Sequence, residues 1–255
     1  MTSSKIKSDI EKETIGCDTV KVMEFAQYVR TGLKVHEKAV GNGMHLYRYC
    51  CEIMERTDFE VSSIMEIGAN YGQDAEFLRL FWGVDNEYVY TFEANPRISE
   101  EIDRRYKFHN YNSAVSDYTG KIMLNLVGEE DANSGLSSVK DYDYTNDWDK
   151  KEVDCIAMKD FLDLHNEITT IDFLKVDAEG VNYEVLKGFG EYLDKVRIIQ
   201  TEAENLLVYD GKHYLFNDVA KLLMNYGFEL IMYDLHKVQS DSLWIKSDLL
   251  KKEKF

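Results

Sequence analysis

Five short segments of the sequence combine residue types that bind ligands or move protons. Glycines, carboxylates and amides are concentrated in them, and each follows an apolar run. If those runs are parallel strands, their carboxyl ends meet at one edge of a sheet, where open α/β folds bind ligands. The segments lie at residues 65–72, 92–96, 112–117, 174–180 and 200–205.

The first segment, MEIGANYG at residues 65–72, ends a strand and opens a helix. Gly68 and Gly72 allow a tight turn and a close approach of the backbone to a ligand. The helix start offers free N–H groups to a carboxylate or phosphate. Neither the dinucleotide pattern G-x-G-x-x-G nor the P-loop G-K-[ST] is present. A small zwitterionic ligand therefore fits better than NAD or ATP, and a plain strand–helix turn is the alternative.

The next two segments suit a nucleoside. Glu93 ends the second strand about 20 residues after the glycine turn, where an acid can accept both hydrogen bonds of a ribose diol. A surface glutamate that caps the following helix is the alternative. Ser113 and Ala114 follow the third strand and could frame an adenine, although the same composition also makes a turn.

The last two segments bring charges to the end of a buried strand. Lys175, Asp177 and Glu179 alternate there, so they share one side if the strand continues that far. Glu202 ends the next strand and is expected to face the same edge. Buried charges are costly unless they are paired or functional. We favour a functional site over a structural ion-pair cluster, because this edge is the expected mouth of the sheet.

Short strands alternate with helices from residue 61 onward. This order predicts an α/β domain at residues 58–255 with a mostly parallel sheet and helices on both faces. Residues 1–57 have helical periodicity with a break at residues 41–43 and predict an N-terminal helical extension. The predicted strands are 62–67, 88–92, 108–113, 121–127, 171–176, 196–201, 228–233 and 242–246, and the predicted helices are 74–82, 98–106, 183–193 and 217–226.

Composition narrows the class of protein. The chain has 255 residues and a formal net charge of −17, which disfavours nucleic acid as a partner. It contains no apolar run of about 18 residues, and its first ten residues lack the apolar core of a secretory signal. The four cysteines match no zinc signature. We expect a soluble cytoplasmic protein with no membrane or nucleic-acid partner.

Taken together, the five segments resemble the FkbM family of methyltransferases, within the Rossmann-like class I fold. The matching stretches include MEIGANYGQD, TFEANPRISEEI, NSGLSSV, DFLKVDAEGVNYEVLKGFG, RIIQTEAEN and DSLWI, in the family's order across residues 60–246. The resemblance implies a seven-stranded sheet with an antiparallel last hairpin. It also implies S-adenosylmethionine as the cofactor.

The resemblance assigns a part of that cofactor to each segment. Asp177 would lie beside the sulfonium and the amino group. Glu66 stands where aspartate is common, and Ala94 stands where proline is frequent, yet both are expected at the cofactor site. The remaining assignments are Gly68, Asn70 and Gly72 for the methionine part, Glu93 for the ribose, and Ser113 and Ala114 for the adenine.

Family members are generally O-methyltransferases of sugars or of hydroxyls on secondary metabolites. A base near the acceptor hydroxyl could take its proton. Asp177, Glu179 and Glu202 are the candidates, of which we favour Glu179 or Glu202, and Lys175 could orient a carboxylate or the acceptor oxygen. Asp177 and Glu202 would suit magnesium, but two carboxylates are too few to predict a metal.

The expected partner is a small-molecule or glycan acceptor. Residues 202–213 would set acceptor specificity, residues 131–138 could cover the acceptor, and the acidic aromatic stretch 141–148 suits either carbohydrate or a solvated loop. Residues 1–57 could cover the cofactor, line the acceptor pocket or pair two subunits into a homodimer. The alternatives are an RNA ribose 2′-O- or protein methyltransferase, an NAD- or nucleotide-sugar-binding oxidoreductase, and a catalytically inactive binding module.

Overall fold

The computed structural model describes residues 37–126, 137–140, 149–206 and 214–252, with only the backbone of residues 37–44. The described residues fall into two compact units, which meet in sequence between Phe59 and Glu60. No helix among them is long and apolar enough to cross a membrane. The predicted cover at 131–136, the stretch 141–148 and residues 207–213 of the predicted specificity region lie outside the described residues.

The described part of the first unit contains a single long helix, α3 (Glu37–Arg56). It continues through Gly41 and Gly43, so the break predicted there is wrong. A glycine costs a helix only about 1 kcal/mol relative to alanine. The surrounding residues, which include Ala39, Met44 and Leu46, are good enough helix formers to outweigh that cost.

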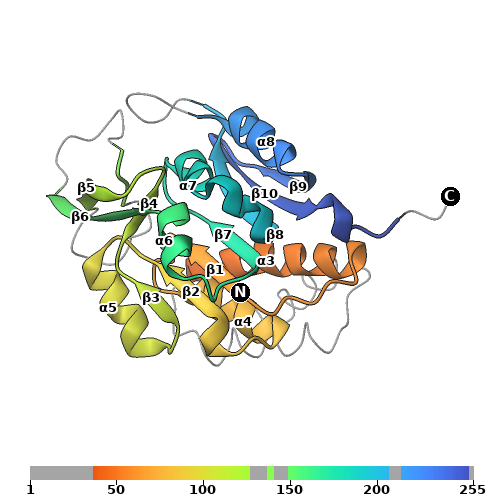
Figure 1. The fold of residues 1–255 in the computed structure, drawn as a ribbon, viewed down its shortest axis with the longest axis horizontal. Helices are drawn as coiled ribbons and strands as arrows, with labels where there is room; N and C mark the ends of the chain where they lie inside the picture. The colour runs from red at the N-terminus through yellow and green to blue at the C-terminus, as the bar shows by residue number, and fades with distance from the viewer. Residues whose placement is uncertain (1–36, 127–136, 141–148, 207–213, 253–255) are drawn as a thin grey trace. The chain divides into compact units, whose positions relative to one another are not determined.

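The second unit is built on a seven-stranded sheet with the order β3-β2-β1-β7-β8-β10-β9 (Figure 1). The first five strands in this order are parallel, and β10 is antiparallel to both of its neighbours. The expected Rossmann-like fold with an antiparallel last hairpin is confirmed. The strands are β1 (Ile64–Ile67), β2 (Val89–Phe92), β3 (His109–Tyr111), β7 (Ile171–Val176), β8 (Val196–Glu204), β9 (Phe228–Leu235) and β10 (Gln239–Lys246).

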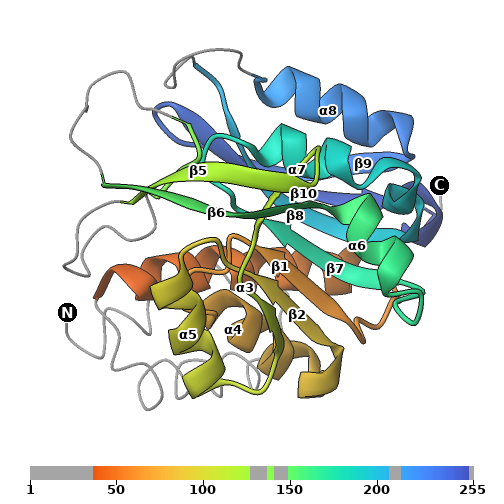
Figure 2. The same cartoon turned by 60° about the vertical axis from the view of Figure 1, so that its left-hand side comes forward.

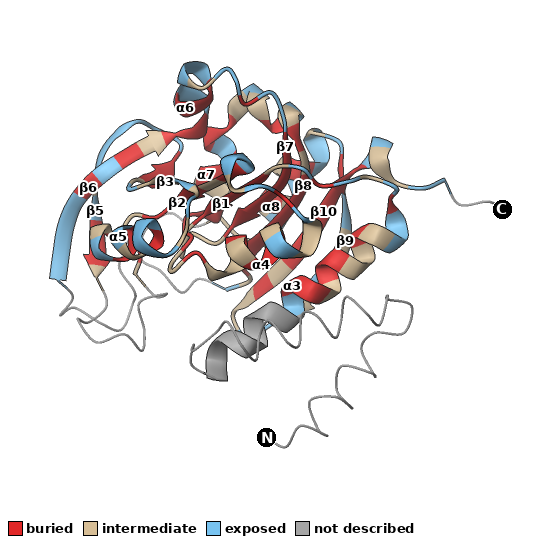
Figure 3. Cartoon of the chain, turned by 90° about the horizontal axis from the view of Figure 1, so that it is seen from below, coloured by how far each residue is buried: buried red, intermediate tan, exposed pale blue. Residues whose placement is uncertain are grey.

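Helices cover both faces of this sheet (Figure 2). Two lie on one face, α4 (Gln73–Trp82) and α5 (Pro96–Arg105), and three on the other, α6 (Met158–Leu164), α7 (Asn182–Gly188) and α8 (Phe216–Asn225). Strands buried on both faces are expected to be apolar throughout. All six residues of β7 are buried, as the red strands in Figure 3 illustrate. Short 3₁₀ helices span Asn86–Tyr88, Gly190–Lys195 and Ser247–Leu249.

A second, three-stranded sheet with the order β4-β6-β5 lies between β3 and α6 in sequence. Its strands are β4 (Ala114–Ser116), β5 (Gly120–Leu126) and β6 (Asp149–Ala157). Only β5 was predicted. β4 is too short to show a period, and most outward positions of β6 carry charged side chains that lower its apolar signal. The small core of this sheet consists of Ala114, Leu124, Val153 and Cys155.

Helix α7 packs closely on the second sheet, and a glycine makes this possible. A Cβ atom added to Gly188 would lie 2.1 Å from the backbone oxygen of Ser116 in β4. Backbone atoms cannot move aside as a flexible side chain can. The absence of a side chain at Gly188 therefore allows α7 to lie directly against β4. This helix follows the charged turn at the end of β7.

Gly188→Ala should lower the free energy of unfolding by about 1–3 kcal/mol, the usual cost of overpacking a filled interior. Gly120→Ala is the matched control, because its added Cβ would meet only the ring of Tyr118 at 3.8 Å. This control should stay within about 0.5 kcal/mol of the parent. Urea denaturation followed by circular dichroism measures both. Equal losses in the two variants would show that α7 can shift away from β4.

Candidate active site

A pocket opens at the carboxyl ends of β1, β2 and β7, beside the start of β4. Eight residues singled out from the sequence line it: Gly68, Asn70, Glu93, Ala94, Ser113, Ala114, Asp177 and Glu179. Four others, Glu66, Gly72, Lys175 and Glu202, do not line it. Residues from four of the five segments therefore line one pocket, whereas the buried side chains of Glu66, Lys175 and Glu202 lie outside its lining.

The glycine turn touches the end of β7 directly. Gly68 has a φ of +79°, and a Cβ added there would lie 2.0 Å from the backbone oxygen of Asp177. Glycine is required at residue 68 both by its conformation and by this approach. Asn70 also has a positive φ, of 47°, and Gly72 precedes α4 at a φ of 72°. Gly72 has no side chain to cap the start of α4.

Glu93 links the end of β2 to the glycine turn. Its carboxylate accepts hydrogen bonds from the backbone N–H groups of Asn70 and Asn95, each at 2.8 Å. Burial raises the pKa of Glu93 to about 7, although the backbone N–H groups around it favour the charged form. This carboxylate therefore changes charge close to neutral pH while it lines the pocket.

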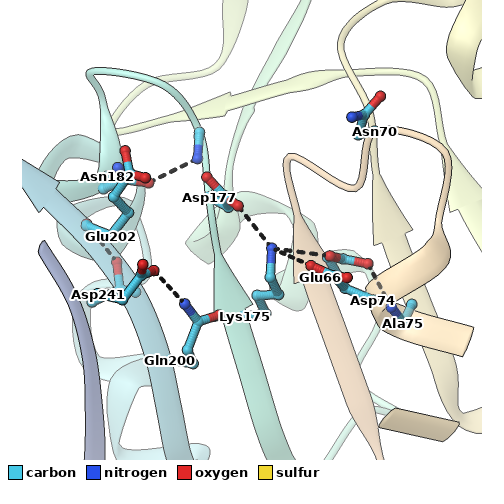
Figure 4. A network of polar contacts seen from close by, with 12 residues as sticks. Glu66, Asn70, Asp74, Ala75, Lys175, Asp177, Asn182, Gln200, Glu202 and Asp241 are labelled. Carbon is cyan, nitrogen blue, oxygen red and sulfur yellow. Dashed lines mark hydrogen bonds and ion pairs between the residues drawn. The ribbon is translucent and has the colours of Figure 1, made fainter. Parts of the chain in front are cut away.

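Lys175 lies at the centre of a buried charge cluster (Figure 4). Its Nζ atom is 2.9 Å from Asp177, 3.2 Å from Asp74 and 3.3 Å from Glu66, and its side chain is only 4% exposed. Burial opposes its charge, but the carboxylates outweigh burial and hold the pKa of Lys175 well above its usual value. The lysine is thus placed to position Asp177 and the glycine turn, not to reach an acceptor.

Glu66 is the most deeply buried acid of that cluster. Its carboxylate accepts a hydrogen bond from the backbone N–H of Ala75, in the first turn of α4, at 2.9 Å. Burial raises the pKa of Glu66 to about 8, against the opposing effect of Lys175. Glu66 therefore supports the turn from below by joining β1, α4 and β7, and it does not line the pocket.

Three carboxylates meet where β7 and β8 end. One oxygen each of Asp177, Glu179 and Glu202 lies within 4.8 Å of the other two. The parallel register pairs Val176 with Thr201, which places Asp177 beside Glu202. Because β7 ends at Val176, Glu179 reaches this group from the following turn and not from the continued strand that the sequence pattern assumed.

Glu202 differs from its two neighbours in its surroundings. It is 8% exposed and accepts a hydrogen bond from Gln239 of β10. Burial first, and then the charges of Asp177 and Glu179, raise the pKa of Glu202 well above its usual value. Asp241 adds a further acidic group, and burial also raises its pKa. Glu202 thus has a strong tendency to hold a proton, whereas Glu179 lines the pocket.

Sequence reasoning missed Leu124 and Val139, which line the pocket together with Ser137 and Ser138. The alternation in β5 could have marked Leu124 as an inward residue. The two serines belong to residues 131–138, for which the sequence predicts a cover for the acceptor, but no sequence signal distinguishes them within that hydroxyl-rich segment.

Lys175→Met should reduce the free energy of unfolding by about 3–5 kcal/mol, because it leaves buried carboxylates without a counter-charge. The loss should shrink as the pH falls, because protonation of the carboxylates left without the lysine removes their unpaired charge. Lys121→Met is the control, because Lys121 pairs with Asp154 where the two side chains are 56% and 68% exposed. That control should lose about 1 kcal/mol or less. A similar small loss for Lys175→Met, by denaturant titration, would contradict the central role of Lys175.

Several known proteins are similar to this chain. The curated 2-O-methyltransferase NoeI of Sinorhizobium fredii is 25% identical over 247 residues, which cover 87% of this chain and 98% of that protein. Among solved structures, methyltransferase FkbM from Methylobacillus flagellatus KT has a TM-score of 0.47 at 14% identity, over 73% of this chain and 44% of that one. TrmK of M. capricolum, solved with S-adenosyl-homocysteine, has a TM-score of 0.43 at 9% identity, over 79% of this chain and 68% of that one.

The family assignment rests on a match to the model of a whole protein family. The sequence profile of the methyltransferase FkbM domain matches residues 66–230, which is more than half of the chain. The match begins at Glu66 of the glycine turn and ends in β9, so it contains all the strand ends that line the pocket. The chain therefore belongs to the FkbM family of S-adenosylmethionine-dependent methyltransferases.

Proposed function

We propose that this enzyme transfers the methyl group of S-adenosylmethionine to a hydroxyl oxygen of a sugar, a glycan or a secondary metabolite. The observation that carries this proposal is Glu179, which lines the pocket and shares a cluster of carboxylates with Asp177 and Glu202. Oxygen acceptors need such a base because a neutral hydroxyl is a poor nucleophile. The name of the relative NoeI, a 2-O-methyltransferase, supports the same choice of acceptor atom.

The pocket residues suit the parts of the cofactor in turn. Glu93 would accept hydrogen bonds from the ribose hydroxyls, and Ser113 and Ala114 would lie by the adenine. The turn around Gly68 and Asn70 would approach the methionine part, whose ammonium group and sulfonium are both positive. Asp177 offers them a negative charge that Lys175 holds in place at 2.9 Å. The bound cofactor supplies an already activated methyl group, so the protein mainly has to align the acceptor oxygen with it.

Glu179 suits the role of general base better than Glu202 does. A base must be ionised before the reaction, and burial together with neighbouring charges favours the protonated form of Glu202. Glu202 would then donate a hydrogen bond to a neighbouring carboxylate and limit the repulsion among the three. In this arrangement Glu179 would take the hydroxyl proton as the acceptor oxygen bonds to the methyl carbon. The bond between that carbon and the sulfonium sulfur would break and leave S-adenosylhomocysteine, and Lys175 would act only through Asp177.

The relatives also bear on the alternatives. Membership of a methyltransferase family excludes the oxidoreductase alternative. A sugar or metabolite hydroxyl as the acceptor is supported by the name of the relative NoeI, a 2-O-methyltransferase.

Binding of S-adenosylhomocysteine should weaken about tenfold when the pH falls from 8 to 6, because protonated Glu93 can no longer accept both ribose hydrogen bonds. The pKa of about 7 that burial gives Glu93 sets this range. Calorimetry at both pH values measures the change. Glu93→Gln should bind more weakly and lose most of the pH dependence. If the variant keeps the slope of the parent, another group titrates and the ribose role of Glu93 is wrong.

Glu179→Gln should lower kcat by at least about 100-fold, the usual contribution of a general base, while the affinity for S-adenosylhomocysteine stays unchanged. Glu202→Gln is the matched control and should retain most activity, since it preserves the uncharged state that burial favours. The assay follows methyl transfer from labelled cofactor to methyl glycosides of common hexoses and to small hydroxylated metabolites.

Both variants and the parent are assayed with and without excess EDTA. Unchanged parent activity in EDTA would show that the carboxylates act as acid–base groups and not as metal ligands. The reverse order of activities, with Glu202→Gln inactive and Glu179→Gln active, would transfer the role of base to Glu202. Normal turnover by both variants would refute a carboxylate base altogether.

A further inference from the structure

We propose that residues 137–140 form a latch that positions Glu179, with Ser138 as the positioning residue; this inference rests on the proposed function. The segment touches the turn that carries Glu179, the first turn of α7 and the pocket wall at once. None of the roles assigned to Glu179 above explains these contacts. Their geometry indicates that the second sheet, through this latch, sets where the base stands.

The central contact joins Ser138 to the backbone of Glu179. Ser138 Oγ donates a hydrogen bond to the carbonyl oxygen of Glu179 at 2.6 Å and accepts one from the N–H of Lys140 at 3.0 Å. The residue is 2% exposed, so water cannot easily replace either partner. A hydroxyl is needed here, because only a group that donates and accepts can serve both neighbours.

The turn is held on its other side by α7. The side-chain oxygen of Asn182 accepts a hydrogen bond from the N–H of Ala178 at 2.8 Å. Asn182 therefore fixes the peptide group between Asp177 and Ala178, and Ser138 fixes the peptide group between Glu179 and Gly180. If the second restraint is lost, the base can rotate about the first.

An ion pair attaches the same latch to α7. Lys140 Nζ lies 3.0 Å from Glu184, and the side chains are only 14% and 16% exposed. Dissolved salt weakens an ion pair this buried less than it weakens the surface ion pairs of the molecule. Lys140 lies two residues after Ser138, and Glu184 lies five residues after Glu179. The ion pair therefore keeps Ser138 in register with the turn that carries Glu179.

The latch is anchored in the second sheet at its other end. Ser138 and Asn125 of β5 exchange backbone hydrogen bonds of 2.8 and 3.2 Å, and the Asn125 side chain donates to the carbonyl of Lys140 at 3.0 Å. Val139 packs against the apolar clusters of both sheets. Since Ser137, Ser138 and Val139 also line the pocket, the element that holds Glu179 is itself part of the pocket wall.

The test compares Ser138→Ala with Ser138→Thr in the full-length protein. Loss of the hydroxyl should lower kcat about tenfold, since small misplacements of a catalytic group reduce rate strongly, while KM for S-adenosylmethionine changes less than threefold. Threonine retains the hydroxyl and should recover most of the rate. Lys187→Met is the matched control, because it breaks another ion pair between α7 and the second sheet, with Asp117, at a more exposed site.

Hydrogen–deuterium exchange gives a readout that needs no acceptor. Amides of residues 178–184 should exchange about tenfold faster in Ser138→Ala than in the parent or in Lys187→Met, with S-adenosylhomocysteine bound in all three, because a broken restraint lowers local stability. Unchanged exchange, or an equal rate loss in Lys187→Met, would overturn the latch. Faster exchange in Ser138→Ala together with normal turnover in Glu179→Gln would instead refute the proposed base.

Discussion

The buried ammonium group of Lys175 is the interaction on which the geometry of the site depends. Carboxylates from three separate elements surround it: Glu66 from β1, Asp74 from α4 and Asp177 after β7. A charge removed from water is tolerated only when its partners stay in place. The lysine therefore fixes the glycine turn, the start of the helix and the negative group expected beside the sulfonium in a single arrangement.

The distribution of charge around this cluster also gives the acids different roles. Glu93 and Glu66 have pKa values raised by burial to about 7 and about 8, and burial also raises the pKa of Glu202 well above its usual value. Several carboxylates of the site are thus close to losing or gaining a proton at neutral pH. A cofactor with two positive groups favours their ionised forms, so cofactor binding and proton release are expected to occur together.

Much of the fold could be predicted because its strands are strongly apolar and end in glycine or acid. The strand at residues 171–176 was predicted to the residue, because four of its six residues are large and apolar, although it also buries Asp172 and Lys175. The second sheet was largely missed, because β6 carries charges on its outer face and β4 has only three residues. The convergence of Gly68, Glu93 and Asp177 could be predicted because each follows a parallel strand, and the carboxyl ends of these strands share one edge of the sheet. The burial of Lys175 depends on contacts between residues distant in sequence, which no local pattern encodes.

The packing of Val139 has a consequence for redesign of the enzyme. This residue belongs to the apolar clusters of both sheets, and it lines the pocket together with Leu124. The second sheet is therefore not an independent module that can be exchanged to alter acceptor choice. A chimera that imports this sheet from a relative also imports one wall of the cofactor pocket. Acceptor specificity and cofactor affinity would then change together, unless Leu124 and Val139 are transferred as a matched pair.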